Sequence, residues 1–303
     1  MSDATLAAAP PVRYGTQPGE SPAFSTIRVL ERHAGVVVAI LLVPLTKPLA
    51  WLALASFAVR MFGIEGIAHR YFSHRSYKAS RPVQFVLALV ALQAGQRGPL
   101  WWGSKHREHH KYADTPRDPH SPGARGFLES YMLWFRRPEN AACNLDEIAD
   151  FAKYPELRWL DRYYIVPFYG GAALLFLVAH AGWLGAGIDG ATALLWGFYV
   201  PSCLVLHATS MINTLAHMPG VPGGYRRYDV ADRSVNRPLL VLLTLGGGFH
   251  NNHHRYGAAA RAGFAWWEID LSYYALRAMQ AAGLIRDVKG TIPDDVLAEG
   301  GLA

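Results

Sequence analysis

Two long apolar stretches alternate with two polar, charge-rich ones along the chain. The first apolar stretch, residues 34–67, holds three formally charged residues, and the second, residues 163–211, holds one. A helix crosses a bilayer with about 20 apolar residues, so each stretch is too long for one crossing and about right for two. The pattern therefore predicts two helical hairpins in a membrane.

Four crossings follow from this division, with turn residues between the members of each pair. The predicted crossings are residues 27–45, 49–68, 163–183 and 191–212. The apolar segment 82–95 is too short to cross and is expected to form an interfacial helix. Residues 1–25 lack the basic start and apolar core of a signal peptide, so they are expected to be a flexible tail before a single domain, residues 26–303.

Composition and charge place these helices relative to the membrane. The chain is 51% hydrophobic and only 17% charged, which is unlike a soluble protein. Four crossings put both termini and the basic segments on one face, which the positive-inside rule assigns to the cytoplasm. The net charge of +6 also suits nucleic acid, but basic residues beside membrane segments more often bind lipid headgroups. We expect an all-α integral membrane protein with four transmembrane helices and a cytosolic helical cap, residues 213–289, and no nucleic-acid partner.

Most of the 13 histidines gather in three short clusters beside the apolar stretches. The clusters are residues 69–74, 106–110 and 250–254, and the last two share the spacing H-x-x-H-H. Positions i, i+3 and i+4 share one helix face, so each triplet is expected to present three imidazoles to one small volume. His69 and His74 lie roughly 140° apart on a regular helix, so they either straddle a helix end, which we favour, or serve different metals.

Convergent histidines of this number indicate metal. Asn213 and His217 add another i, i+4 pair at the foot of the fourth crossing. A lone histidine is by default a surface or hydrogen-bonded core residue, but nine together repel when protonated and are poorly solvated when neutral. Nitrogen ligands suit iron, zinc, copper or nickel rather than magnesium or calcium, and nine ligands require two ions. A non-catalytic metal carrier is the alternative, although carriers usually place ligands along a path within the spans.

The location of the clusters favours iron over zinc. They lie at the mouth of an apolar bundle, where a long hydrocarbon can enter without crossing water. Oxidising an unactivated methylene requires an oxidant made from dioxygen, which redox-inert zinc cannot supply. The sequence thus favours a redox-active metal pair that acts on a lipid chain.

With these clusters, the chain resembles the membrane-bound fatty acid desaturases, in particular their Δ9 acyl-CoA and acyl-lipid branch. The resemblance covers residues 34–289 and includes residues 74–78, 118–120, 213–217 and 225–228. It implies an oxygen-dependent enzyme that introduces a cis double bond, expected at carbon 9, at a di-iron centre with dioxygen as co-substrate. The ligands that it implies are His69, His74, His106, His109, His110, His217, His250, His253 and His254, with Asn213 bound through a water.

The resemblance also implies a bent tunnel that holds the acyl chain beside the metals. The positions that line its kink correspond to Gln96, Trp102 and Thr209 in this sequence. Taken singly, Trp102 suits an interfacial anchor and Thr209 suits a bond to its own helix backbone. The residues expected to orient the ligand imidazoles from behind are Asp114, Asp118 and His120, although Asp118 and Pro119 equally suit the start of a turn.

The expected partners are a fatty acyl substrate, membrane lipid and an electron donor. The acyl chain is carried by coenzyme A or by a lipid, and the sequence leaves both open. Electrons are expected from a separate ferredoxin or cytochrome b5-type protein, which the basic face would attract. A di-iron hydroxylase of alkanes, sterols or lipids is the alternative enzyme, because the same ligands serve both reactions.

Overall fold

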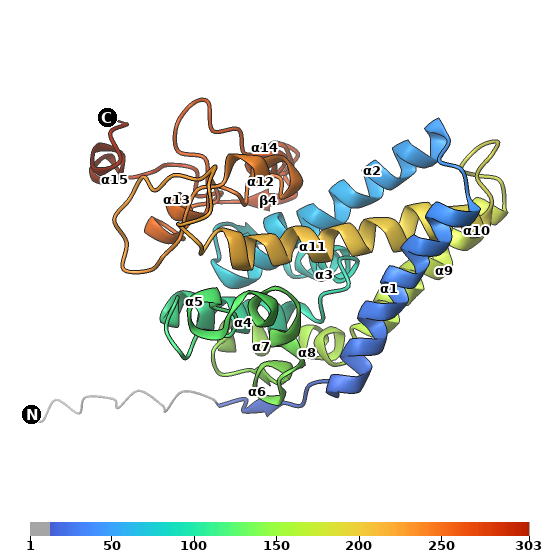
Figure 1. Ribbon diagram of the computed structural model, residues 1–303, viewed down its shortest axis with the longest axis horizontal. Coiled ribbons are helices and arrows are strands. Elements are labelled where there is room, and N and C mark those ends of the chain that lie inside the picture. The colour runs from blue at the N-terminus through green and yellow to red at the C-terminus, as the bar shows by residue number, and fades with distance from the viewer. Residues whose placement is uncertain (1–12, 303) are drawn as a thin grey trace, which may run out of the picture.

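The computed structural model describes residues 13–302 and is mostly helical (Figure 1). The α-helices are α1 (Pro22–Leu42), α2 (Lys47–Phe62), α3 (Arg81–Leu92), α4 (Pro99–Tyr112), α5 (Pro122–Arg125), α6 (Pro138–Ala141), α7 (Ala149–Ala152), α8 (Pro155–Arg162), α9 (Ile165–His180), α10 (Gly190–Leu194), α11 (Val200–Leu215), α12 (Pro238–Leu243), α13 (His250–Arg255), α14 (Leu271–Ala281) and α15 (Asp294–Glu299). Three π-helices, η1 (Gly63–Ser73), η2 (Glu129–Leu133) and η4 (Leu195–Tyr199), and a 3-10 turn, η3 (Trp134–Arg136), complete the helical set. Four two-residue strands, β1 (Thr16–Gln17), β2 (Lys78–Ala79), β3 (Cys143–Asn144) and β4 (Ile285–Arg286), pair as β1–β3 and β2–β4.

Helices occupy all four predicted crossings, but they differ in how well they suit a membrane. Two continuous helices, Lys47–Ser73 and Gly190–Leu215, are long and apolar enough to cross. α9 makes a third if it is joined to α8, from which it bends by 73°. α1 has 21 residues but carries Arg28 and Arg32 in its first half. The structure thus supports two to three membrane helices, and the four-crossing arrangement stays a prediction.

Large apolar side chains cover the outside of these helices. Leu41 is 73% exposed, Trp51 69% and Leu174 63%. Exposed apolar surface of this extent on long helices is expected where lipid is the solvent. Figure 1 shows the α1–α2 connection and α10 together at one end of the molecule, with α12 to α15 at the other end.

Both ends of the chain differ from the expected picture. Residues 1–12 of the predicted tail lie outside the described part of the chain, but β1 pairs with β3 and the Tyr14 backbone N–H donates to Asp146 at 2.7 Å. The described part of the tail is therefore attached to the protein.

In the predicted cap, α12, α13 and α14 are joined by irregular segments, because glycines and prolines interrupt residues 213–289. The segment expected to be interfacial is helical, as α3.

Candidate metal centre

The nine histidines that the sequence singles out come together in two adjacent groups. The first group is His69, His74, His106, His110 and His253, and the second is His109, His217, His250 and His254. Within each group, one nitrogen from every ring lies within 4.8 Å of the others. The rings come from η1, α4, α13 and the segment after α11, so tertiary folding builds the site from four distant parts of the chain.

Each H-x-x-H-H triplet is divided between the two groups, although we expected three imidazoles in one volume. In α4, the i, i+4 pair His106 and His110 faces the first group, whereas His109 faces the second. In α13 the division is reversed: His250 and His254 face the second group, and His253 faces the first. Positions i and i+4 differ by only about 40° around a helix, so the intervening residue naturally points to a neighbouring volume.

A π-helix brings His69 and His74 into one group. η1 ends at Ser73, and the backbone N–H of His74 donates to the His69 carbonyl at 3.2 Å. This i to i+5 bond widens the turn and brings positions five apart onto one face, which a regular α-helix does not do. The prediction that the two residues straddle a helix end is confirmed, because His74 is the C-cap.

The ring nitrogens face one another at a spacing that suits a metal. Neighbouring Nε2 atoms lie 2.9–3.0 Å apart in the first group and 2.9–3.4 Å apart in the second. Nitrogens about 2.1 Å from an ion lie about 3.0 Å apart in octahedral geometry and about 3.4 Å apart in tetrahedral geometry. The five nitrogens of the first group therefore fit an ion of coordination number above four, which is ordinary for iron.

Carboxylates hold four of the nine rings from behind. The Nδ1–carboxylate pairs are His69–Glu65 at 3.0 Å, His109–Asp118 at 3.0 Å, His217–Asp114 at 2.7 Å and His254–Asp232 at 2.9 Å. Because a carboxylate accepts the Nδ1 proton, the Nε2 atom of each of these rings carries a free lone pair. Asp114 and Asp118 lie where the sequence places them, whereas Glu65 and Asp232 were missed.

The pair His109 and His254 shows why a cation fits this site. Both rings bond a carboxylate through Nδ1, yet their Nε2 atoms lie 3.4 Å apart. When Nδ1 holds the only proton of each ring, two lone pairs face each other at this distance and repel. A metal ion at the centre of the group turns this repulsion into ligation, so the donor set fits a metal.

Burial keeps most of the rings neutral. It lowers the pKa of His74, His106, His110 and His250, and the charges of neighbouring histidines lower these pKa values further. Burial alone would raise the pKa of Asp118, but the adjacent His109 and His120 outweigh it and lower that pKa. Neutral imidazoles are the form that binds metal. The pKa of His109 is raised instead, because the adjacent carboxylate of Asp118 outweighs burial.

His120 belongs to neither group and lies behind the second one. Its ring stacks on His109 with centroids 4.5 Å apart, and its backbone N–H donates to Asp118 at 3.0 Å. Burial and the neighbouring His109 lower its pKa to about 3, so the ring is neutral. It is placed to hold His109 in orientation, as expected.

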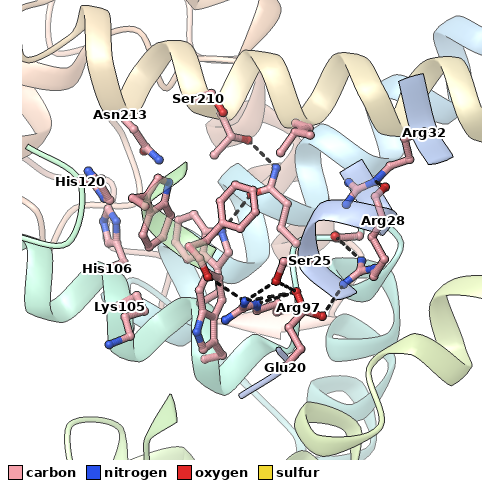
Figure 2. Close-up of a pocket in the computed structure, with 18 residues that line it drawn as sticks. Glu20, Ser25, Arg28, Arg32, Arg97, Lys105, His106, His120, Ser210 and Asn213 are labelled. Carbon is pink, nitrogen blue, oxygen red and sulfur yellow. Dashed lines mark hydrogen bonds and ion pairs between the residues drawn. The ribbon is translucent and has the colours of Figure 1, made fainter. Parts of the chain in front are cut away.

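A cavity reaches the two histidine groups from the α1 side of the molecule (Figure 2). The three predicted tunnel residues all line it and contact one another. The side-chain amide N–H of Gln96 donates to the Thr209 hydroxyl at 2.9 Å. The Trp102 indole N–H donates to the side-chain oxygen of Gln96 at 3.3 Å. Trp102 also stacks on His106 with ring centroids 5.0 Å apart. These residues therefore join the cavity wall to a candidate metal ligand.

Asn213 lines the same cavity and lies beside His120 in Figure 2. It also borders the smaller space that contains His109 and His250. Thr209 has a local role as well, since its hydroxyl donates to the Val205 carbonyl of its own helix at 2.9 Å. The structure thus brings every site residue predicted from the sequence to the histidine groups or to the cavity beside them.

Comparison with known proteins agrees with this geometry. The family model for fatty acid desaturases matches residues 46–288. The chain is 34% identical over 250 residues to an acyl-CoA 5-desaturase of Anemone leveillei, covering 81% of this chain and 73% of the relative. It is 32% identical over 287 residues to an sn-2 palmitoyl-lipid 9-desaturase of Nostoc sp. (strain 36), covering 91% and 94%, and 33% identical over 241 residues to a Delta-9 acyl-lipid desaturase of Arabidopsis thaliana, covering 79% and 74%. The chain therefore belongs to the fatty acid desaturase family, whose members are oxidoreductases.

Proposed function

We propose that this protein is an oxygen-dependent fatty acyl desaturase that introduces a cis double bond at carbon 9 of a saturated acyl chain. The observation that carries the proposal is the pair of histidine groups, with Nε2 atoms facing inward and four Nδ1 atoms bonded to carboxylates. The cavity lined by Gln96, Trp102 and Thr209 gives an acyl chain a place beside these groups. The Δ9 assignment is supported by relatives named as 9-desaturases.

Two irons are the proposed cofactor, one in each histidine group, with Asn213 bound to the second through a water. When bound, they supply the oxidising power of dioxygen. The reaction removes two hydrogens from adjacent carbons, takes up one dioxygen, two electrons and two protons, and yields the alkene and two waters. The electrons come from a separate donor, a ferredoxin or a cytochrome b5-type protein, attracted by the basic surface.

The protein's own contribution is to orient the substrate and exclude water. The hydrogen bonds among Gln96, Trp102 and Thr209 fix the cavity wall beside His106. A fixed wall selects which carbon pair meets the metals, because a reacting chain must be held in near-attack geometry. A cavity filled by the acyl chain also keeps water away from reactive species.

The proposed topology has four membrane crossings, with both termini and the histidine groups on the cytoplasmic side and one domain over residues 26–303. It is supported by the hairpin pattern of α1–α2 and α9–α11 and by the basic segments that flank them. The substrate is an acyl-CoA or an acyl-lipid, and the relatives include enzymes named for each.

Expression in a host that lacks this activity tests the proposal. Gas chromatography with mass spectrometry of the host's fatty acids is expected to show a new cis-9 monounsaturated chain, which a His254→Ala variant does not produce. A hydroxylated product would instead identify a hydroxylase. Metal uptake without oxygen consumption or any lipid product would identify a carrier.

A further inference from the structure

The end of the cavity farthest from the metal groups is lined by arginines. Figure 2 shows Arg28 and Arg32 on the opposite side of the cavity from His120 and Asn213. Both side chains come from α1 and are buried, with 3% and 4% of their surface exposed. Ionised side chains at this depth are expensive unless they are paired or serve a ligand.

The cationic side chains that line the cavity outnumber the carboxylates. Four line it, Arg28, Arg32, Arg97 and Lys105, against one carboxylate, Glu20. Glu20 pairs with Arg28 and with Arg97, each at 3.2 Å. Lys105 pairs with Glu108 at 3.0 Å, away from the cavity. The excess positive charge therefore lies at the α1 end.

Arg32 forms no ion pair with a carboxylate among residues 13–302, although its guanidinium lies 6.0 Å from the Phe168 ring. Its Nε donates to the Arg28 carbonyl at 3.1 Å, but its Nη1 is buried with no hydrogen-bond partner among the described residues. The neighbouring carboxylate, Glu31, bonds the hydroxyls of Tyr169 and Tyr199 instead. The Nε of Arg28 is likewise buried and unpartnered within the part of the chain that the structure describes. Two guanidinium groups with free donors in one cavity fit an oxyanion.

We propose that Arg28 and Arg32 form a subsite for a phosphate oxyanion carried by the acyl substrate. This inference rests on the proposed function and deepens it. The oxyanion is the phosphate of a phospholipid or a phosphate of coenzyme A, and in either case an anionic acyl substrate binds better than a neutral glycolipid.

Lipid binding to metal-free protein tests the subsite independently of catalysis. Native mass spectrometry in neutral detergent would compare dipalmitoyl phosphatidylglycerol, palmitoyl-CoA and dipalmitoyl monogalactosyldiacylglycerol. Arg32→Gln removes the free charge but keeps a polar side chain. Arg60→Gln is the matched control, because Arg60 is 5% exposed, has a buried unpartnered Nε, and does not line the cavity. Thermal unfolding checks that both variants are folded.

We expect at least one anionic ligand to bind about tenfold or more tightly than the galactolipid, as a charge-assisted contact predicts. Arg32→Gln is expected to remove that preference, and Arg60→Gln to keep it. The anionic ligand that responds identifies the source of the oxyanion. Equal binding of all three ligands to the native protein, or an unchanged preference in Arg32→Gln, would overturn the subsite. Selective binding without desaturation would leave the subsite intact and refute the proposed function instead.

Discussion

Replacing Asp232 by asparagine probes the candidate metal centre at a residue that touches no metal. One Asp232 oxygen accepts the His254 Nδ1 proton at 2.9 Å, and the other accepts the Ser234 backbone N–H at 2.8 Å. Asparagine offers one acceptor for these two donors. In either amide orientation, an N–H group faces another N–H group, and the shape of the side chain is otherwise unchanged.

The expected outcome is a change of tautomer in His254. To relieve the clash, Nδ1 becomes an acceptor and the proton moves to Nε2, the atom that faces the second group. A protonated Nε2 cannot bind metal. The proton must therefore return to Nδ1 before His254 binds the ion, and the free energy of that step lowers the metal affinity. Loss of such a carboxylate typically weakens metal affinity by about 10- to 100-fold, equivalent to about 1.4–2.7 kcal/mol.

Competition with a chelator measures the affinity of each ion in anaerobically loaded protein. Asp232→Asn is expected to weaken one of the two ions and to leave the other within about twofold. Asp229→Asn is the control, because this side chain lies three residues away and is fully exposed. If Asp232→Asn and Asp229→Asn release metal equally, the carboxylate does not support His254 and the assignment of the second group is refuted.

Three further perturbations test other parts of the account. His109→Ala is expected to abolish turnover while membrane insertion, followed by fractionation, stays intact; near-normal activity would remove His109 from the ligand set. Thr209→Leu places a larger side chain in the cavity, so the desaturated products should shift toward shorter acyl chains before the iron content falls. An unchanged chain-length profile would contradict the tunnel assignment. Burial raises the pKa of Asp161 to about 6, so folding favours its protonated form, and stability is lost as pH rises from about 4 to about 6. This loss of folding free energy amounts to up to about 3 kcal/mol, and thermal unfolding of Asp161→Asn over the same pH range should not show it. If the variant and the native protein have the same pH dependence, Asp161 does not have this raised pKa.

Most of the candidate ligands could be singled out because their spacing is local. The i, i+3 and i+4 pattern puts histidines on one side of α4 and α13 whatever the tertiary structure is. How the two metal groups divide these histidines could not be predicted, since the division depends on how α4 and α13 face each other. The π-helix around His69 was equally hidden, because no local rule marks where an extra residue enters a turn.

The supporting carboxylates show the same limit. Asp114 and Asp118 follow the second cluster closely and were predicted to orient ligands. Glu65 lies four residues before His69, so the sequence held a signal that could have identified it. Asp232 lies 22 residues before His254 in an irregular segment, and only the folded chain brings the two together.

The prediction of a flexible tail was wrong for residues 13–25. These residues hold no long apolar run, yet the pairing of β1 with β3, the ion pairs of Glu20 and the packing of Tyr14 on the core attach them to the protein. The arginines of α1 were hidden in a similar way. No spacing pattern in the sequence marks them, and only the structure shows that they line a cavity beside the candidate ligands.

The central claim is that the two histidine groups hold two irons. Anomalous diffraction at the iron edge, on protein loaded under anaerobic conditions, tests it most directly. The account predicts two iron peaks per chain, one within reach of the Nε2 atoms of His69 and His110 and the other within reach of those of His217 and His250. A chain without stoichiometric iron, or with iron bound elsewhere while these rings remain unligated, would contradict it.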